Sequence, residues 1–143
     1  MKKLQFFLGV LSMLISSSLL AQNLAHHRWE NRILLVFTDD FKNPLYVKQI
    51  KHWQAFEQGM KERKLRVYHI ARSDLKEGIK LMQRLKKSST WDTLKKTKKT
   101  FEIQLIGLDG GVKRVKNEFL DTQELFAIID AMPMRKAELQ RQE

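Results

Sequence analysis

The sequence predicts an α/β domain in which a central mixed sheet carries helices on both faces. Three observations lead to this fold class. An unbroken apolar run at 33–37 is typical of a strand that is buried on both sides. A hairpin with two glycines at its turn lies at 101–116. Between and after these strands, apolar residues recur with the period of an α-helix.

The hairpin is the clearest element of the prediction. Apolar and polar residues alternate over 101–105, and Val112 and Val115 follow the turn. The turn is Asp-Gly-Gly at 109–111, and its glycines can adopt the positive φ that a tight turn requires. The other oxygen ligands and the closing glutamate of a calcium loop are missing, so this turn is predicted to be structural.

The first 21 residues have the order of a secretory signal peptide. Lys2 and Lys3 precede an apolar run, and small residues lead to Ala21. The apolar run is short for a membrane span, and no second run of spanning length follows it. We expect cleavage near Ala21 and a secreted, periplasmic or extracellular protein with no transmembrane span after signal removal. A retained N-terminal anchor is the alternative.

After this segment, residues 22–28 are polar and are expected to form a flexible N-terminus. Residues 29–143 are expected to form one domain with its own core. His26 and His27 lie before the domain, but no third ligand is in view. No metal site and no cofactor is therefore predicted.

The chain contains no cysteine, which excludes a disulfide, a thiolate nucleophile and a redox-active cysteine pair. Its net charge of +11 favours an anionic partner, such as an envelope polysaccharide, lipid headgroups or an acidic protein. Secretion makes nucleic acid the least favoured of the anionic partners. The plain alternative is that the charge only keeps the protein soluble.

The first half of the domain is predicted to be a strand–helix–strand unit. Asn43 is a good N-cap and Pro44 suits the first turn of a helix over residues 45–63. The second strand is expected at 65–70, parallel to the first because a helical crossover joins them. His69 within that strand is expected to be a structural histidine.

The middle of the domain is predicted to contain a second helix that opens at Asp74, with Glu77 completing a capping box. Gly78 weakens this helix somewhat. Its apolar stripe consists of Leu75, Ile79, Met82 and Leu85. A short helix is expected to begin near residues 89–90.

After the hairpin, Asp121 and Glu124 are predicted to form a capping box for a last helix that reaches Met132. Pro133 interrupts its pattern, and a polar tail follows, for which a helix is one option. The resulting order is strand, helix, strand, helix, strand, strand, helix. A crossover unit followed by a hairpin and a closing helix is the thioredoxin-type arrangement.

Two groups of residues are candidate binding sites. The first is the loop after the first strand, where open α/β sheets bind ligands. Its carboxylates could bind a cation or act as acid and base, but the same residue types are ordinary in turns and caps. The possible loop site consists of Thr38, Asp39, Asp40 and Lys42.

The second group is a lysine-rich stretch over 84–99, in which the only acid is Asp92. Lysines there could hold phosphate, sulfate or carboxylate groups as point charges. A solvated loop is the competing interpretation. The candidate binding residues are Lys86, Lys87, Lys95, Lys96, Lys98, Lys99 and Arg114.

Four stretches, at 27–37, 62–67, 105–113 and 129–139, together resemble a bacterial domain-of-unknown-function family related to the P-DUDES domain. That domain occurs in animal sushi-repeat-containing proteins and coiled-coil-domain-containing matrix proteins. The resemblance implies a peroxiredoxin-like thioredoxin fold in a secreted or periplasmic protein. For the animal relatives it also implies a link to extracellular matrix and adhesion, but it supplies no catalytic residues.

The chain departs from working thioredoxins and peroxiredoxins where their reactive cysteine lies, since residues 38–43 contain no sulfur. The proline that usually precedes the third strand is also missing, and Lys99 and Thr100 stand there. We therefore expect a non-redox binding module that recognises an anionic partner through its lysine-rich edge. One alternative is a cysteine-free enzyme that uses the loop at 38–43; another is a purely structural partner domain.

Overall fold

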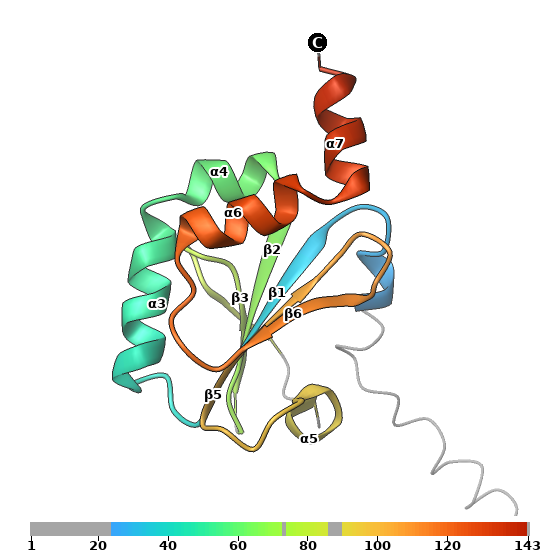
Figure 1. Cartoon of the computed structure of the whole chain (residues 1–143). Coiled ribbons are helices and arrows are strands. Elements are labelled where there is room, and N and C mark those ends of the chain that lie inside the picture. Colours follow the sequence, from blue (N-terminus) through green and yellow to red (C-terminus); the bar gives the residue numbers. More distant parts are fainter. Residues whose placement is uncertain (1–23, 73, 86–89, 143) are drawn as a thin grey trace, which may run out of the picture.

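The computed structural model describes residues 24–72, 74–85 and 90–142, and Figure 1 shows their arrangement. The expected signal peptide at 1–21 lies outside the described residues. In chain order, the elements are β1 (Arg32–Thr38), α3 (Pro44–Gln54), α4 (Glu57–Glu62), β2 (Leu65–Ile70), β3 (Leu75–Glu77), β4 (Gln83–Leu85), α5 (Thr90–Leu94), β5 (Phe101–Ile106), β6 (Val112–Lys116), α6 (Thr122–Asp130) and α7 (Pro133–Gln140).

The strands of the described residues form one six-stranded mixed sheet in the order β4-β3-β2-β1-β5-β6. β1 and β2 are parallel, and the other neighbouring strands are antiparallel. The mixed sheet, the parallel pair and the hairpin β5–β6 confirm the prediction. Every residue of β1 is buried, as expected of an unbroken apolar strand at the centre of a sheet.

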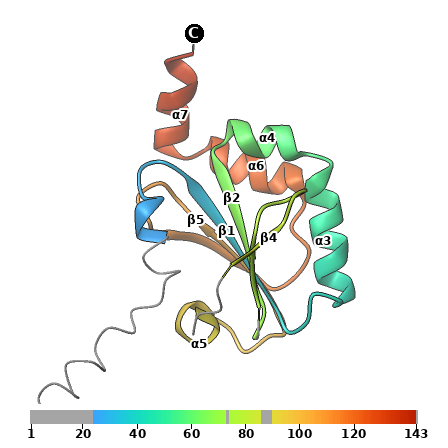
Figure 2. The ribbon, with the colours of Figure 1, turned by 180° about the vertical axis from the view of Figure 1, so that it is seen from behind.

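Helices lie on both faces of the sheet, but unequally. On one face, α3, α4 and α6 bury Tyr46, Trp53, Met60 and Leu125 against alternate residues of β1, β2 and β5. On the other face, a smaller cluster includes Trp91 of the short helix α5, whose ring centroid lies 5.9 Å from that of Phe37. The two views in Figures 1 and 2 show α5 on the opposite side from α3, α4 and α6.

The predicted helix over residues 45–63 is divided into α3 and α4. Asn43 caps it as expected, because its Oδ1 accepts a hydrogen bond from the Leu45 amide at 2.9 Å. The helix ends after Gln54, and α4 begins at Glu57 without a side-chain cap. The apolar periodicity alone did not indicate this break.

The prediction of a helix opening at Asp74 is wrong, because this part of the chain forms the hairpin β3–β4. Gly78 has φ +113, a conformation that ends any helix and that other residues rarely adopt. Asp74 accepts hydrogen bonds from the Leu75 amide and from Arg84. Glu77, the expected capping-box partner, pairs with Arg66 of β2. The hairpin pairs with the second half of β2, residues 68–70, on the side away from β1.

The last helices agree with the prediction except at one cap. Asp121 Oδ2 accepts from the Gln123 amide at 2.6 Å and so caps α6. Glu124 does not complete the capping box; it pairs with Lys116 and Arg114 of β6. The polar tail is helical, since α7 begins at Pro133.

The beginning of the described chain lies against the folded domain. Residues 24–26 form a helical turn. The His27 Nε2 atom lies 2.6 Å from the Tyr68 hydroxyl, and the Trp29 amide donates to the Leu108 carbonyl at 2.7 Å. This segment therefore contacts the sheet and the β5–β6 hairpin. Among the described residues, no helix combines the length and apolar character needed to cross a bilayer.

Candidate functional site

Members of the two groups of candidate residues, Asp39 from the loop and Lys95, Lys98 and Lys99 from the lysine-rich stretch, lie at one end of the sheet. β1 and β2 are parallel, so their carboxyl ends lie at the same edge, which is the usual ligand-binding edge of an α/β sheet. A hollow of about 320 Å³ lies there. We call it the basic hollow; its lining residues are Asp39, Arg72, Trp91, Asp92, Lys95, Thr97, Lys98, Lys99 and Thr100.

The loop of residues 38–43 is held by its own side chains. The buried Thr38 hydroxyl donates to the Asp40 carbonyl at 2.7 Å. The Asp40 carboxylate accepts from the Lys42 amide at 2.8 Å, and the Asp39 carboxylate accepts from the Asn43 side-chain amide at 2.9 Å. These are turn and cap interactions. Of the four predicted loop residues, only Asp39 lines the hollow.

Asp39 is exposed, and its pKa lies below the ordinary value for an aspartate. The hydrogen bond from the Asn43 side chain is the main cause, with smaller contributions from backbone amides and Thr38. Its carboxylate is therefore ionised at neutral pH. Such a group can accept a proton or repel an anion, but it is poorly suited to donating a proton.

The lysines of the basic hollow differ in their surroundings. Lys95 has a side chain only 7% exposed, 3.9 Å from the buried Glu102 carboxylate, and it also bonds the Thr97 carbonyl. Its charge is thus largely compensated inside the protein. Lys98 and Lys99 are exposed and make no ion pair with a described residue. These two side chains are available to a ligand.

Glu102 was not among the candidate residues, although it positions the lysine-rich segment. Its Oε1 accepts from the Lys96 amide at 2.8 Å, and its Oε2 accepts from the Thr97 amide at 2.6 Å. Burial alone raises the pKa of Glu102, but hydrogen bonds from Thr97, Lys96 and Gln104 outweigh it and leave the pKa below the ordinary value. Glu102 is a polar residue in a strand where apolar and polar residues alternate, so the sequence did not indicate that its side chain would be buried.

Arg72 is the second residue that sequence reasoning missed. It follows β2, is exposed, and its guanidinium carbon lies 5.4 Å from the Trp91 ring centroid. The Lys95 ammonium lies at the same distance from that ring. Trp91 therefore supports two cations at the wall of the hollow. Only the parallel pairing of β1 and β2 brings Arg72 to this place.

The remaining candidates do not line the hollow. Arg114 lies on β6 and pairs with Glu124 at 3.6 Å. Lys96 is exposed and borders a different hollow. Lys86 and Lys87 lie outside the described residues.

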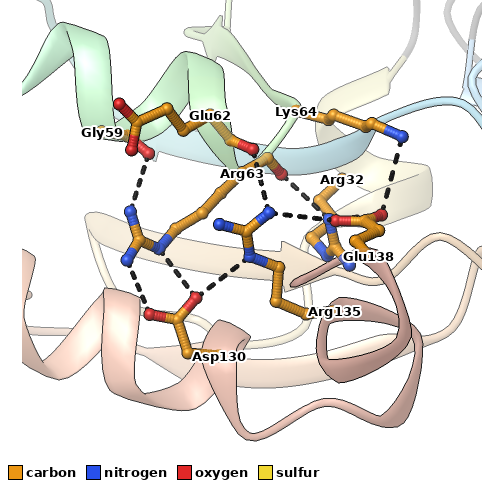
Figure 3. Close-up of polar contacts among 8 residues, drawn as sticks. All are labelled: Arg32, Gly59, Glu62, Arg63, Lys64, Asp130, Arg135 and Glu138. Carbon is orange, nitrogen blue, oxygen red and sulfur yellow. Dashed lines mark hydrogen bonds and ion pairs between the residues drawn. The ribbon is translucent and has the colours of Figure 1, made fainter. Parts of the chain in front are cut away.

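A second group of charged residues lies at the opposite end of the sheet. We call it the ionic cluster, and Figure 3 shows its contacts. Asp130 of α6 accepts from Arg63 at 2.6 Å and from Arg135 at 3.2 Å. Glu138 of α7 pairs with Arg32, Lys64 and Arg135. The cluster consists of Arg32, Arg63, Lys64, Asp130, Arg135 and Glu138.

The ionic cluster keeps its two carboxylates ionised. Burial alone raises the pKa of Asp130, but hydrogen bonds from Arg63 and Arg135 lower it below the ordinary value. Burial also acts on Glu138, and the bonds and charges of its cationic neighbours, Arg32 first among them, again lower the pKa. The Arg32 Nε and Nη2 atoms are buried without a hydrogen-bond partner in the described chain. Glu138 is therefore the main compensation for the Arg32 charge.

The described part of the chain offers no group of side chains that could hold a metal ion. No cluster of three or more histidine, aspartate or glutamate side chains is present there. Asp109 is used in its turn, where it accepts from the Gly111 amide at 3.0 Å and pairs with Lys113 at 2.6 Å.

Together, the fold and its site define a cysteine-free mixed α/β domain with a basic hollow at the carboxyl ends of its parallel strands. The family model described as "Domain of unknown function (DUF4174)" matches residues 23–138, and the chain belongs to that family. No curated protein and no solved structure matches the chain.

Proposed function

We propose that the protein is a non-redox binding module that recognises an anionic partner through the basic hollow. Lys98 and Lys99 are exposed without ion pairs in the described chain, and this observation carries the proposal. Arg72 adds a third exposed cation to the lining of the basic hollow. The ligand chemistry is that of phosphate, sulfate or carboxylate groups on a polysaccharide, a lipid surface or an acidic protein.

The rigidity of the site supports binding rather than a merely solvated loop. The Glu102 carboxylate anchors the amides of Lys96 and Thr97. Asn117 donates to the Thr97 hydroxyl at 2.8 Å and to the Phe101 carbonyl at 2.9 Å. The segment before Lys98 is thus fixed from two sides. A fixed segment loses less conformational entropy when its lysines bind a ligand.

We propose further that the fold is thioredoxin-like and related to the P-DUDES domain. The crossover from β1 to β2, the hairpin β5–β6 and the closing helix α6 support this topology. The hairpin β3–β4 and α5 replace the second helix of that arrangement. The relationship to the P-DUDES domain rests on the stretches at 27–37, 62–67, 105–113 and 129–139. The order of charged, apolar and small residues in 1–21 supports secretion to the periplasm or beyond.

The test is binding to heparin and, separately, to phosphatidylglycerol vesicles over a series of salt concentrations. The double substitution Lys98→Ser with Lys99→Ser is expected to weaken binding roughly tenfold and to reduce its salt dependence. The control is Lys51→Ser with Lys136→Ser, which removes the same charge from exposed positions on α3 and α7. If both double variants bind alike, net charge alone explains the binding and the proposed site is wrong.

The alternative function is a cysteine-free enzyme that uses the loop of residues 38–43. One observation favours it, since the Asp39 carboxylate borders a hollow large enough for a small substrate. The lowered pKa of Asp39 keeps its carboxylate ionised, which suits it to binding a cation or acting as a weak base and not to donating a proton. Asp39→Asn separates the two functions: it abolishes such an activity but strengthens anion binding, because it removes a negative charge from the hollow.

A further inference from the structure

The outer edge of β2 is only partly covered. β2 extends from Leu65 to Ile70, but β3 pairs only with Tyr68, His69 and Ile70. The Gly78 amide donates to the Val67 carbonyl at 3.0 Å, where the chain leaves the sheet. On the side away from β1, residues 65–67 therefore have no strand beside them among the described residues.

The direction of the main-chain groups at this edge follows from their neighbours. The Lys64 carbonyl accepts from the Arg32 amide, so it points toward β1. Successive residues of a strand alternate, and the Val67 carbonyl points outward to Gly78. The amide and carbonyl of Leu65 and the amide of Val67 must then also point outward. These groups form a short open row of donors and acceptors.

The open row borders a hollow of about 820 Å³ between α4 and the β3–β4 loop. We call it the edge hollow. Its inner wall is apolar and includes Met60, Leu65, Val67 and Ile79. Leu81, at the tip of the loop, is 92% exposed and adds an apolar side chain at the rim.

The rim of the edge hollow carries more cations than anions. Four basic side chains line it, against Glu57 and Glu77. Glu57 is shared between Lys61 and Lys80, at 3.1 Å from each, and Glu77 lies 3.8 Å from Arg66. Lys64 pairs with Glu138 of the ionic cluster at 3.7 Å, so three cations face the two carboxylates and a net positive charge remains for an incoming chain. The basic residues are Lys61, Lys64, Arg66 and Lys80.

We propose that the edge hollow binds an extended acidic peptide segment of another protein, which adds to the sheet as a short strand beside residues 65–67. The open main-chain groups would supply its hydrogen bonds, and the apolar wall and Leu81 would receive alternate side chains. The basic rim selects acidic residues on the opposite side of the peptide. A second copy of this chain is disfavoured as the partner, because its net charge is +11.

This surface is distinct from the basic hollow, since the two lie at opposite ends of β2. The edge hollow lies beside Leu65, where β2 begins, whereas Arg72 follows the end of the strand. The proposal therefore does not depend on the proposed function, and each surface can fail alone.

The experiment uses the full chain and a capped peptide of alternating glutamate and valine. We expect the peptide to slow hydrogen exchange at the Leu65 and Val67 amides and to bind more weakly as salt is raised. Two further peptides carry N-methyl groups on the glutamates only or on the valines only. In an extended peptide, the amides of the glutamates point to one edge and the amides of the valines point to the other. Only one edge of the added strand faces β2, so one methylated peptide must lose binding and the other must keep it. Equal binding of both peptides, or unchanged exchange at both amides, overturns the proposal.

Protein variants locate the binding. Lys61→Gln with Lys80→Gln is expected to weaken peptide binding roughly tenfold, and Leu81→Ser to weaken it as well. The matched control is Lys51→Gln with Lys136→Gln, which is expected to leave peptide binding unchanged. If only Lys98→Ser with Lys99→Ser weakens binding, the peptide lies in the basic hollow and the edge hollow is not a docking surface.

Discussion

The Arg32 guanidinium and the Glu138 carboxylate meet at 3.2 Å although 106 residues separate them in the chain. Arg32 opens the central strand and is fully buried, whereas Glu138 lies on α7, which projects from the body of the domain in both views of the fold (Figures 1 and 2). Arg135, also on α7, donates to the Glu62 carbonyl at 3.1 Å. Charged and polar contacts thus tie the last helix to the start of β1 and the end of α4.

Glu138→Gln is expected to destabilise the protein by roughly 3 kcal/mol, because a buried Arg32 would lose the carboxylate that compensates its charge. The measurement is the free energy of unfolding in urea. Glu118→Gln is the matched control, since Glu118 is exposed and has no ion pair in the described chain. Equal midpoints for Glu138→Gln and the unchanged protein would mean that Arg32 is compensated elsewhere.

The turn at Gly78 gives a second prediction. A Cβ atom at this position would lie 2.3 Å from the Leu81 carbonyl oxygen, and φ is +113. Gly78→Ala is therefore expected to lower the free energy of unfolding by roughly 1–3 kcal/mol, which thermal unfolding measures. Gly111→Ala serves as the control, because its φ is not in the left-handed region and its nearest contact is 3.4 Å. A melting temperature for Gly78→Ala that matches this control would contradict the argument.

Gly78 also shows why part of the fold could not be predicted. The spacing of Leu75, Ile79, Met82 and Leu85 fits one face of a helix. In the structure, Leu75 and Leu85 join the cluster on one face of the sheet, and Ile79 and Met82 join the cluster on the other. The same spacing thus fits a hairpin whose loop folds over the sheet. The need to cover the β2 edge is a tertiary effect that local periodicity does not contain.

Elements with an independent local signal were predicted correctly. The strands β1, β2, β5 and β6 follow from apolar runs and a glycine turn, and Asn43 and Asp121 mark the helix starts. Of the candidate site residues, Asp39, Lys95, Lys98 and Lys99 line one hollow, because the antiparallel pairing of β1 with β5 brings the end of β1 beside the residues that precede β5. Residues whose roles depend on distant partners, such as Arg72 and Glu102, had no local signal.

Glu102 gives a prediction about the lysine-rich segment. Glu102→Gln replaces an acceptor oxygen with a donor, so either the Lys96 or the Thr97 amide loses its partner. We expect a loss of roughly 2 kcal/mol in stability and faster hydrogen exchange at the Thr97 amide. Asp92→Asn is the control, because it removes one exposed carboxylate of the same segment. Unchanged exchange at Thr97 in Glu102→Gln would show that the segment is held by other contacts.

His69 predicts how stability depends on pH. Its Nε2 lies 2.6 Å from the Gly78 carbonyl, which can only accept, so Nε2 carries the proton. Its Nδ1 lies 3.0 Å from the Tyr46 hydroxyl and, in the neutral ring, accepts from it. Burial lowers the pKa of His69 to about 4, from an ordinary value of 6.5, while the bond to Gly78 opposes this shift. The folded protein thus holds His69 neutral.

The unfolded chain binds a proton at His69 below pH 6.5, and the folded chain binds it only near pH 4. The contribution of neutral His69 to the free energy of unfolding is therefore fully present above pH 6.5 and is lost as the pH falls toward 4. The difference amounts to about 3 kcal/mol. Urea unfolding at a series of pH values measures it. His69→Gln should flatten the slope across this window, whereas His26→Gln, at an exposed position, should keep it. An equal slope in both variants would mean that His69 is charged in the folded state or that other groups dominate the titration.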